Sequence, residues 1–277
     1  MQRPSLMLVA VILAACRGPI PEEQTSLSLD PGPDPGAPSR QLTMLWTHHS
    51  TGDNLLSGGL LDALRANNIA FYDINYEEAR VGDYVIGDHT DPPDFPKNFN
   101  TPQYFDVIKR WELKPPRKQH DIIMFKSCYP ASDIKSDAML EQYKGYYQSL
   151  LPTFRANPEI LFIPMSTPPR VKRRTTPDQA ARARTFARWL TTQYARELPN
   201  VQAFDLFNAL AIREGRPDEN TLAPQFAESA TDSHPTAAGA RAVARLFIPW
   251  LNRALSSYPR LAPRSGAAGS SSTSPIR

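Results

Sequence analysis

Two polar segments, one near each end of the sequence, carry residue types that can cleave an ester. His49 and Ser50 follow an apolar run, while Asp232 and His234 precede a long helical pattern. A serine hydroxyl is a weak nucleophile that needs a base beside it, and histidine accepts and returns protons near neutral pH. We therefore expect acyl transfer with Ser50 as nucleophile, His234 as base and then acid, and Asp232 as the carboxylate that orients His234. This chemistry requires no metal and no organic cofactor.

Short apolar runs alternate with helical patterns and supply the elements that must bring these segments together. Strands are predicted at residues 42–47, 69–74, 121–125, 160–164 and 201–204, and helices at 54–67, 136–155, 176–198 and 236–255. A long loop is predicted between the second and third strands. The alternation predicts an α/β fold, a three-layer α/β/α flavodoxin-like sandwich with a doubly wound parallel sheet. The carboxyl ends of parallel strands share one edge, so Ser50 and His234 can meet there.

The same two segments resemble motifs of the SGNH (GDSL-like) hydrolase superfamily. In that family a Gly-Asp-Ser sequence follows the first strand, and an Asp-x-x-His-Pro sequence precedes the last helix. This chain has His48-His49-Ser50 and Asp232-Ser233-His234-Pro235 at these places. The family's aspartate position is occupied by Thr231, and Asp232 lies one residue closer to the histidine. The resemblance implies a serine ester hydrolase, with a Ser-His dyad as the alternative to a full triad.

The resemblance also implies an oxyanion hole. The family takes its donors from the serine backbone, a glycine after the second strand and an asparagine after the third. Ser50 and Gly82 are the counterparts of the first two, and Cys128 falls where the asparagine would be. The Ser127 hydroxyl or a backbone N–H is an alternative donor.

Each of these residues also has an interpretation without catalysis. Ser50 could cap the helix expected near Asn54, His234 could cap the last helix, and Asp232 could be a favourable charge at that helix's N-terminus. Cys128 is either a buried apolar group or itself a nucleophile. The altered motifs also fit a second class, a surface binding protein that has kept the fold and lost catalysis.

Three further groups are open to a functional interpretation. A metal site is conceivable from His48, His49, Asp53, Asp88 and His89, but adjacent histidines in a strand point to opposite faces, which argues against a shared ion. A basic run forms either a solvated loop or an attractor for anionic ligands: Arg170, Lys172, Arg173 and Arg174. Three tyrosines on one predicted helix are expected to pack rather than bind sugar: Tyr143, Tyr146 and Tyr147.

The N-terminus has the pattern of a secretory signal. Arg3 precedes a short apolar run that ends Leu13-Ala14-Ala15-Cys16, which resembles the lipobox of bacterial lipoproteins. Residues 1–15 are then a signal peptide, and acylated Cys16 anchors the protein to a membrane outside the cytoplasm; an ordinary signal peptide is the alternative. Arg17 favours the outer membrane. This location and the resemblance imply an O-acyl ester substrate, such as an O-acetyl ester, on an envelope or extracellular carbohydrate or on a small lipid.

Composition limits the remaining possibilities. Residues 16–40 are rich in Pro and Gly and predict a tether, residues 41–260 the folded domain, and residues 261–277 a disordered tail. A formal net charge of +3 lacks the basic excess of nucleic-acid-binding proteins. Two cysteines and five histidines leave little material for a disulfide framework or a structural zinc site.

Overall fold

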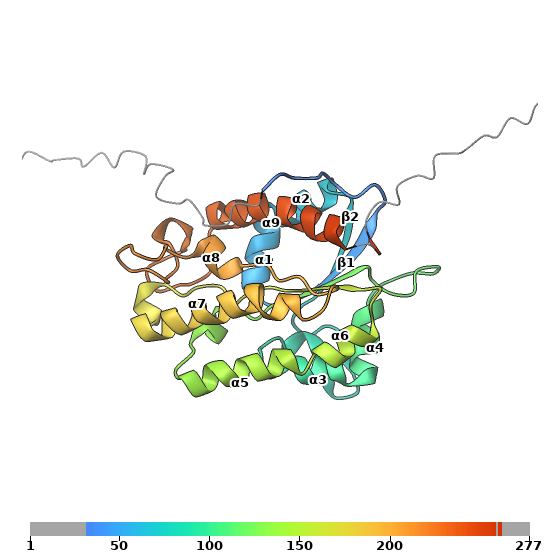
Figure 1. The fold of residues 1–277 in the computed structure, drawn as a ribbon, viewed down its shortest axis with the longest axis horizontal. Helices are drawn as coiled ribbons and strands as arrows, with labels where there is room; N and C mark the ends of the chain where they lie inside the picture. Colours follow the sequence, from blue (N-terminus) through green and yellow to red (C-terminus); the bar gives the residue numbers. More distant parts are fainter. Residues whose placement is uncertain (1–31, 259, 262–277) are drawn as a thin grey trace, which may run out of the picture.

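A four-stranded parallel sheet forms the centre of the computed structural model, which describes residues 32–258, 260 and 261 (Figure 1). Its strands are β1 (Leu42–Thr47), β2 (Ile69–Ile74), β5 (Ile122–Phe125) and β6 (Leu161–Pro164), in the order β2-β1-β5-β6. All three neighbouring pairs are parallel. Every residue of β1, β5 and β6 is buried, as expected for strands covered on both faces. The predicted α/β class with a parallel sheet is confirmed.

The fifth predicted strand, residues 201–204, adjoins β6 only through isolated bridges. Phe162 bridges to Val201, and Met165 bridges to Phe204. Pro164 lies between these bridges and has no N–H to donate across the sheet, so the ladder is interrupted there. The bridges still place this segment beyond β6 and complete the flavodoxin-like order.

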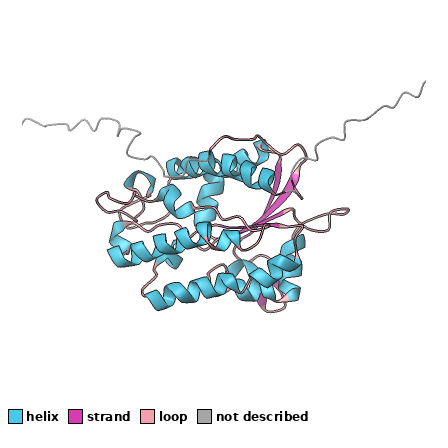
Figure 2. Cartoon of the chain, in the orientation of Figure 1, coloured by secondary structure: helices cyan, strands magenta, loops and turns pink. Residues whose placement is uncertain are grey.

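Helices cover both faces of the sheet, which gives three layers (Figures 1 and 2). One face carries α1 (Thr51–Leu55), α2 (Leu61–Ala66) and α9 (Ala237–Ser257). The other face carries α3 (Phe95–Asn100), α4 (Pro102–Arg110), α5 (Asp137–Gln148), α6 (Leu151–Ala156) and α7 (Pro177–Thr192). Alternating residues of β1 feed two separate apolar clusters: Met44 and Trp46 face the first and Leu45 the second. This alternation fixes which way each strand end points.

The helix predicted at residues 54–67 begins three residues earlier and is not uniform. Helix α1 starts at Thr51, directly after Ser50, and continues through a π-helical segment (Leu56–Leu60) into α2. Gly58 in this segment approaches α9 so closely that a side chain there would collide with Ala240. The close approach ties the start of the first helix to the start of the last one.

The other predicted helices differ from the structure at their ends. The helix predicted at residues 136–155 is two helices, α5 and α6, because Pro152 in the first turn of α6 cannot continue a preceding helix. Helix α7 ends at Thr192, earlier than predicted. Its predicted capping box is confirmed: Thr176 accepts a hydrogen bond from the Gln179 backbone, and the Gln179 side chain bonds back to Thr176.

The prediction of a long loop between the second and third strands is wrong. This segment forms a hairpin of β3 (Arg80–Val81) and β4 (Tyr84–Val85), followed by α3 and α4. These elements are too short to show a hydrophobic period. They nevertheless contribute Phe95 and Phe99 to the aromatic cluster around Phe125. The packing role predicted for Tyr143 and Tyr147 is confirmed, since both are buried in the same cluster.

Several predictions concern parts of the chain outside the described residues. These are the signal peptide, Cys16 and most of the tether, together with residues 262–277 of the tail. Within residues 32–258, 260 and 261, no helix is both long and apolar enough to cross a membrane.

Candidate active site

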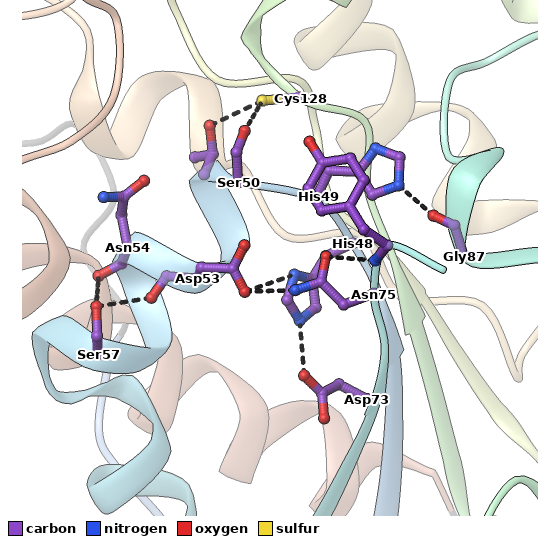
Figure 3. A network of polar contacts seen from close by, with 12 residues as sticks. His48, His49, Ser50, Asp53, Asn54, Ser57, Asp73, Asn75, Gly87 and Cys128 are labelled. Atoms are coloured by element: carbon purple, nitrogen blue, oxygen red, sulfur yellow. Dashed lines mark hydrogen bonds and ion pairs between the residues drawn. The ribbon is translucent and has the colours of Figure 1, made fainter. Parts of the chain in front are cut away.

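Ser50 lies between β1 and α1, at the position that normally caps a helix. Its side chain makes no capping hydrogen bond. Ser50 Oγ lies 2.8 Å from Cys128 Sγ, at hydrogen-bond distance (Figure 3), and Thr51 Oγ1 lies 3.2 Å from the same sulfur. The interpretation of Ser50 as a helix cap is therefore wrong. Its hydroxyl stands at the carboxyl edge of the sheet, where it is free of a structural role in the helix.

His234 and Asp232 form a pair in the loop before α9. Asp232 Oδ1 accepts a hydrogen bond of 3.0 Å from the His234 backbone N–H and lies 2.7 Å from His234 Nδ1. The cap of α9 is Thr236, whose side chain accepts from the Gly239 N–H, so His234 does not cap this helix. Hydrogen bonds from the His234 backbone and side chain hold the pKa of Asp232 below its ordinary value. A spacing of two residues thus lets the carboxylate hold the imidazole through Nδ1.

Tyr129 connects the serine and histidine halves of the site. It follows Cys128 in the chain, and the edge of its ring packs against the His234 imidazole with the ring centroids 4.9 Å apart. Ser50 and His234 therefore both lie next to the Cys128-Tyr129 segment, which follows β5 at the carboxyl edge of the sheet. Within the described residues no hydrogen bond joins Ser50 to His234; the Ser50 side chain is instead hydrogen-bonded to Cys128 and to Tyr76.

The two histidines before Ser50 have separate partners, as their alternation predicts. His48 is fully buried, with Nε2 3.3 Å from Asp73 Oδ2 and Nδ1 4.0 Å from Asp53 Oδ1 (Figure 3). Burial lowers the pKa of His48 and favours the neutral imidazole. His49 Nε2 bonds the Gly87 carbonyl. No group of three or more His, Cys, Asp or Glu side chains able to hold a metal ion occurs in the described part of the chain.

The four residues predicted for the oxyanion hole are placed differently. Ser50 and Cys128 are in contact. Ser127 is fully buried and makes no recorded hydrogen bond with Ser50. Gly82 lies in the turn between β3 and β4 with φ of 59°, and no recorded contact joins it to Ser50.

Gly87 is the glycine that borders the site. Its carbonyl bonds His49, the residue before Ser50 (Figure 3). A side chain at position 87 would collide with the Asn75 carbonyl, so the close approach requires glycine. In the sequence Gly87 is recognisable as a glycine after the second strand, but Gly82 also follows that strand, so the sequence did not distinguish the two glycines.

Part of the basic run fastens the loop that carries His234. Arg174 Nε donates to the Thr231 carbonyl at 3.0 Å, and the Val171 N–H donates to the buried Ser233 hydroxyl at 3.1 Å. Lys172 instead pairs with Asp218 at 2.7 Å. The contacts of Arg174 and Val171 hold the loop that carries His234 in place.

Two residues next to Ser50 were not predicted from the sequence. Tyr76 is 50% exposed and its ring stacks on His49, with centroids 3.8 Å apart. Lys126 is fully buried and donates to the His49 carbonyl at 3.1 Å. A lysine directly after the apolar strand at residues 122–125 is the one signal that could have identified Lys126.

Comparison with known proteins gives structural matches only. The fold is similar to that of a proposed acylhydrolase from Bacteroides fragilis, with 12% identity, a TM-score of 0.50, and coverage of 80% of this chain and 92% of the other. A GDSL-like lipase from Bacteroides thetaiotaomicron has 14% identity, a TM-score of 0.49, and coverage of 77% and 89%. No family model matches the sequence, and a search of curated proteins finds no significant match.

The strand order and the helix layers define an α/β protein whose fold is similar to that of the Bacteroides fragilis protein. The three-layer α/β/α fold predicted from the sequence is confirmed.

Proposed function

We propose that this protein is a serine ester hydrolase with Ser50 as nucleophile, His234 as general base and acid, and Asp232 as the orienting carboxylate. The observation that carries the proposal is the 2.7 Å contact of Asp232 with His234 Nδ1, at the same sheet edge as a serine hydroxyl that caps no helix. With Nδ1 held by the carboxylate, Nε2 is the nitrogen that exchanges protons.

The proposed reaction has two steps. Ser50 Oγ attacks the ester carbonyl carbon while its proton passes to His234, and His234 then protonates the departing alcohol. Water, deprotonated by His234, releases the acyl group from Ser50. Because Ser50 now bonds Cys128, attack requires rotation of its side chain toward His234. The Ser50 backbone N–H is the proposed donor to the oxyanion.

We infer that the substrate is an O-acyl ester of a carbohydrate or small lipid, with O-acetyl as the smallest acyl group. Tyr76 favours the carbohydrate. One face of its ring is stacked on His49, and the side chain is the large apolar group most exposed in the described chain. An exposed aromatic ring beside the nucleophile suits the apolar face of a sugar ring.

Replacing Tyr76 by alanine tests this substrate class. We expect KM for an acetylated oligosaccharide to rise about fivefold, since a lost aromatic contact is worth roughly 1 kcal/mol, while turnover of p-nitrophenyl acetate changes little. Tyr76→Phe keeps the ring and should restore the oligosaccharide KM. Equal effects of Tyr76→Ala on both substrates would argue against a sugar platform.

Fluorophosphonate labelling tests the activity itself. The wild-type protein is expected to form one covalent adduct, located by mass spectrometry on Ser50, and to hydrolyse short acyl esters. A protein that neither labels nor turns over such esters would instead be the binding protein with this fold.

We further propose that the mature protein is held on the outer membrane by acylated Cys16. Several acyl chains on one cysteine give a stable anchor, since each buried CH₂ contributes about 0.8 kcal/mol. Mass spectrometry of the mature N-terminus should find acylated Cys16, and Cys16→Ser should release the protein from membranes. An unmodified N-terminus further along the chain would identify an ordinary signal peptide.

A further inference from the structure

A buried ammonium contacts the backbone of the residue directly before Ser50. Lys126 follows the last residue of β5, and its side chain has 0% exposure. Lys126 Nζ donates to the His49 carbonyl at 3.1 Å and lies 5.9 Å from the centre of the Trp46 ring. The lysine thereby spans from the end of β5 to the end of β1, where Ser50 begins the turn into α1.

This charge has no direct counter-ion. Within residues 32–258, 260 and 261 no carboxylate lies within ion-pair distance of Lys126, although many surface lysines and arginines are paired. Burying an ammonium without a counter-ion costs several kcal/mol, and methionine would fill the same space without that cost. A buried ionisable group beside a candidate nucleophile is typical of functional sites.

The charges around Lys126 come from three directions. His48 and His49 lie between β1 and Ser50; Asp53 lies on α1 and Asp91 in the segment before α3. Cys128 exerts the largest effect of these groups on Lys126. The acidic group most strongly coupled to this lysine is therefore the thiol that contacts Ser50.

The two groups affect each other's ionisation. Burial lowers the pKa of Lys126 to about 8, so the ammonium form still predominates at neutral pH. Burial alone raises the pKa of the Cys128 thiol, but the Lys126 charge and the hydrogen bonds with Ser50 and Thr51 outweigh it and leave that pKa below its ordinary value. The site favours negative charge at the Cys128 sulfur even though that sulfur is buried.

We propose that Lys126 is a positioning residue whose buried positive charge stabilises the negative charge that forms beside Ser50 and Cys128 during ester hydrolysis. This inference rests on the proposed hydrolase function. It gives the lysine the electrostatic role that a side-chain amide would otherwise serve in the oxyanion hole. At pH above about 8 the lysine loses its proton, so this stabilisation is present at neutral pH and is lost as the pH rises.

The test measures Cys128 ionisation and catalysis separately in the full-length protein. Thiolate formation is followed by ultraviolet absorbance, with the spectrum of the Cys128→Ala variant subtracted. In Lys126→Met the midpoint of thiolate formation should move up by about one pH unit or more, and kcat for p-nitrophenyl acetate should fall by about 10- to 100-fold with KM little changed.

Two further variants separate charge from structure. Lys126→Arg keeps the charge and should retain a lower thiol midpoint than Lys126→Met. Lys118→Met removes an exposed lysine before β5, at the opposite edge of the sheet, and should change neither quantity. If Lys126→Met fails to fold, the wild-type titration decides: a Cys128 midpoint at or above the value of roughly 8.5 for a free cysteine would overturn the proposal.

The outcomes also distinguish this inference from the proposed function. A shifted thiol midpoint without ester turnover in the wild type would reject the hydrolase, and with it the catalytic role of Lys126, while confirming the electrostatic coupling. Ester turnover with a thiol midpoint and kcat unaffected by Lys126→Met would reject the inference and leave the hydrolase intact.

Discussion

Replacing Ser50 by alanine is expected to abolish fluorophosphonate labelling and to lower kcat/KM for p-nitrophenyl acetate by a factor on the order of 10⁴. The change removes the atom that forms the acyl-enzyme and leaves only what orientation and electrostatic stabilisation supply. Since the Ser50 side chain caps no helix, the unfolding midpoint should change little. Both labelling and continuous hydrolysis assays measure this effect directly.

The π-helical segment that follows α1 offers a matched control. Ser57 is exposed and donates to the Asp53 carbonyl at 2.7 Å, so Ser57→Ala removes a hydroxyl without touching the proposed nucleophile. It should keep wild-type labelling and turnover. Hydrolysis that survives Ser50→Ala but disappears in Cys128→Ala would show that the nucleophile is the thiol, 2.8 Å away.

Loss of His234 is expected to have a comparable effect. His234→Ala removes the proposed base and acid and should lower kcat by about 10³- to 10⁴-fold. Asp232→Asn leaves a hydrogen-bonding side chain but removes the charge that stabilises the imidazolium. Because the Asp232 side chain is 44% exposed and solvent screens its charge, we expect a smaller loss of about 10- to 100-fold.

The pH dependence of these variants follows from the carboxylate. Hydrogen bonds from His234 lower the pKa of Asp232, so its charge is present above the ordinary aspartate range and is lost only as the pH falls through the lowered pKa. The loss in Asp232→Asn should therefore be uniform around neutral pH. Asp178→Asn, which changes an exposed first-turn residue of α7, is the control. If Asp232→Asn keeps wild-type activity, the carboxylate is not needed for catalysis and the site works as a Ser-His dyad.

The local geometry explains why the altered motif can still work. In the family pattern the aspartate lies three positions before the histidine, whereas here Asp232 lies two positions before His234 and bonds both its backbone N–H and its ring. A short polar side chain readily forms such a turn two residues on. The different spacing is thus accommodated within the loop, which Arg174 fastens through Thr231.

Local sequence determined the elements that carry the site. Apolar runs long enough to be buried on both faces specify β1, β5 and β6, and the Thr176-Pro177 sequence specifies the start of α7, because these signals act between residues close in the chain. The positions of Ser50 and His234 at the ends of such elements could therefore be predicted. The pairing of Asp232 with His234 is local too, since only Ser233 stands between them in the sequence.

Tertiary structure alone decided what surrounds the nucleophile. The Ser50 hydroxyl contacts Cys128, 78 positions away, and not the backbone of its own helix. Lys126 contacts the His49 carbonyl because β5 lies beside β1 in the sheet, and no local pattern encodes that neighbour. Residues 201–204 pair with β6 only through isolated bridges, because Pro164 lacks the N–H that a continuous ladder across the sheet would need. Contacts between distant segments depend on strand order and register, which the spacing of residues in one segment does not contain.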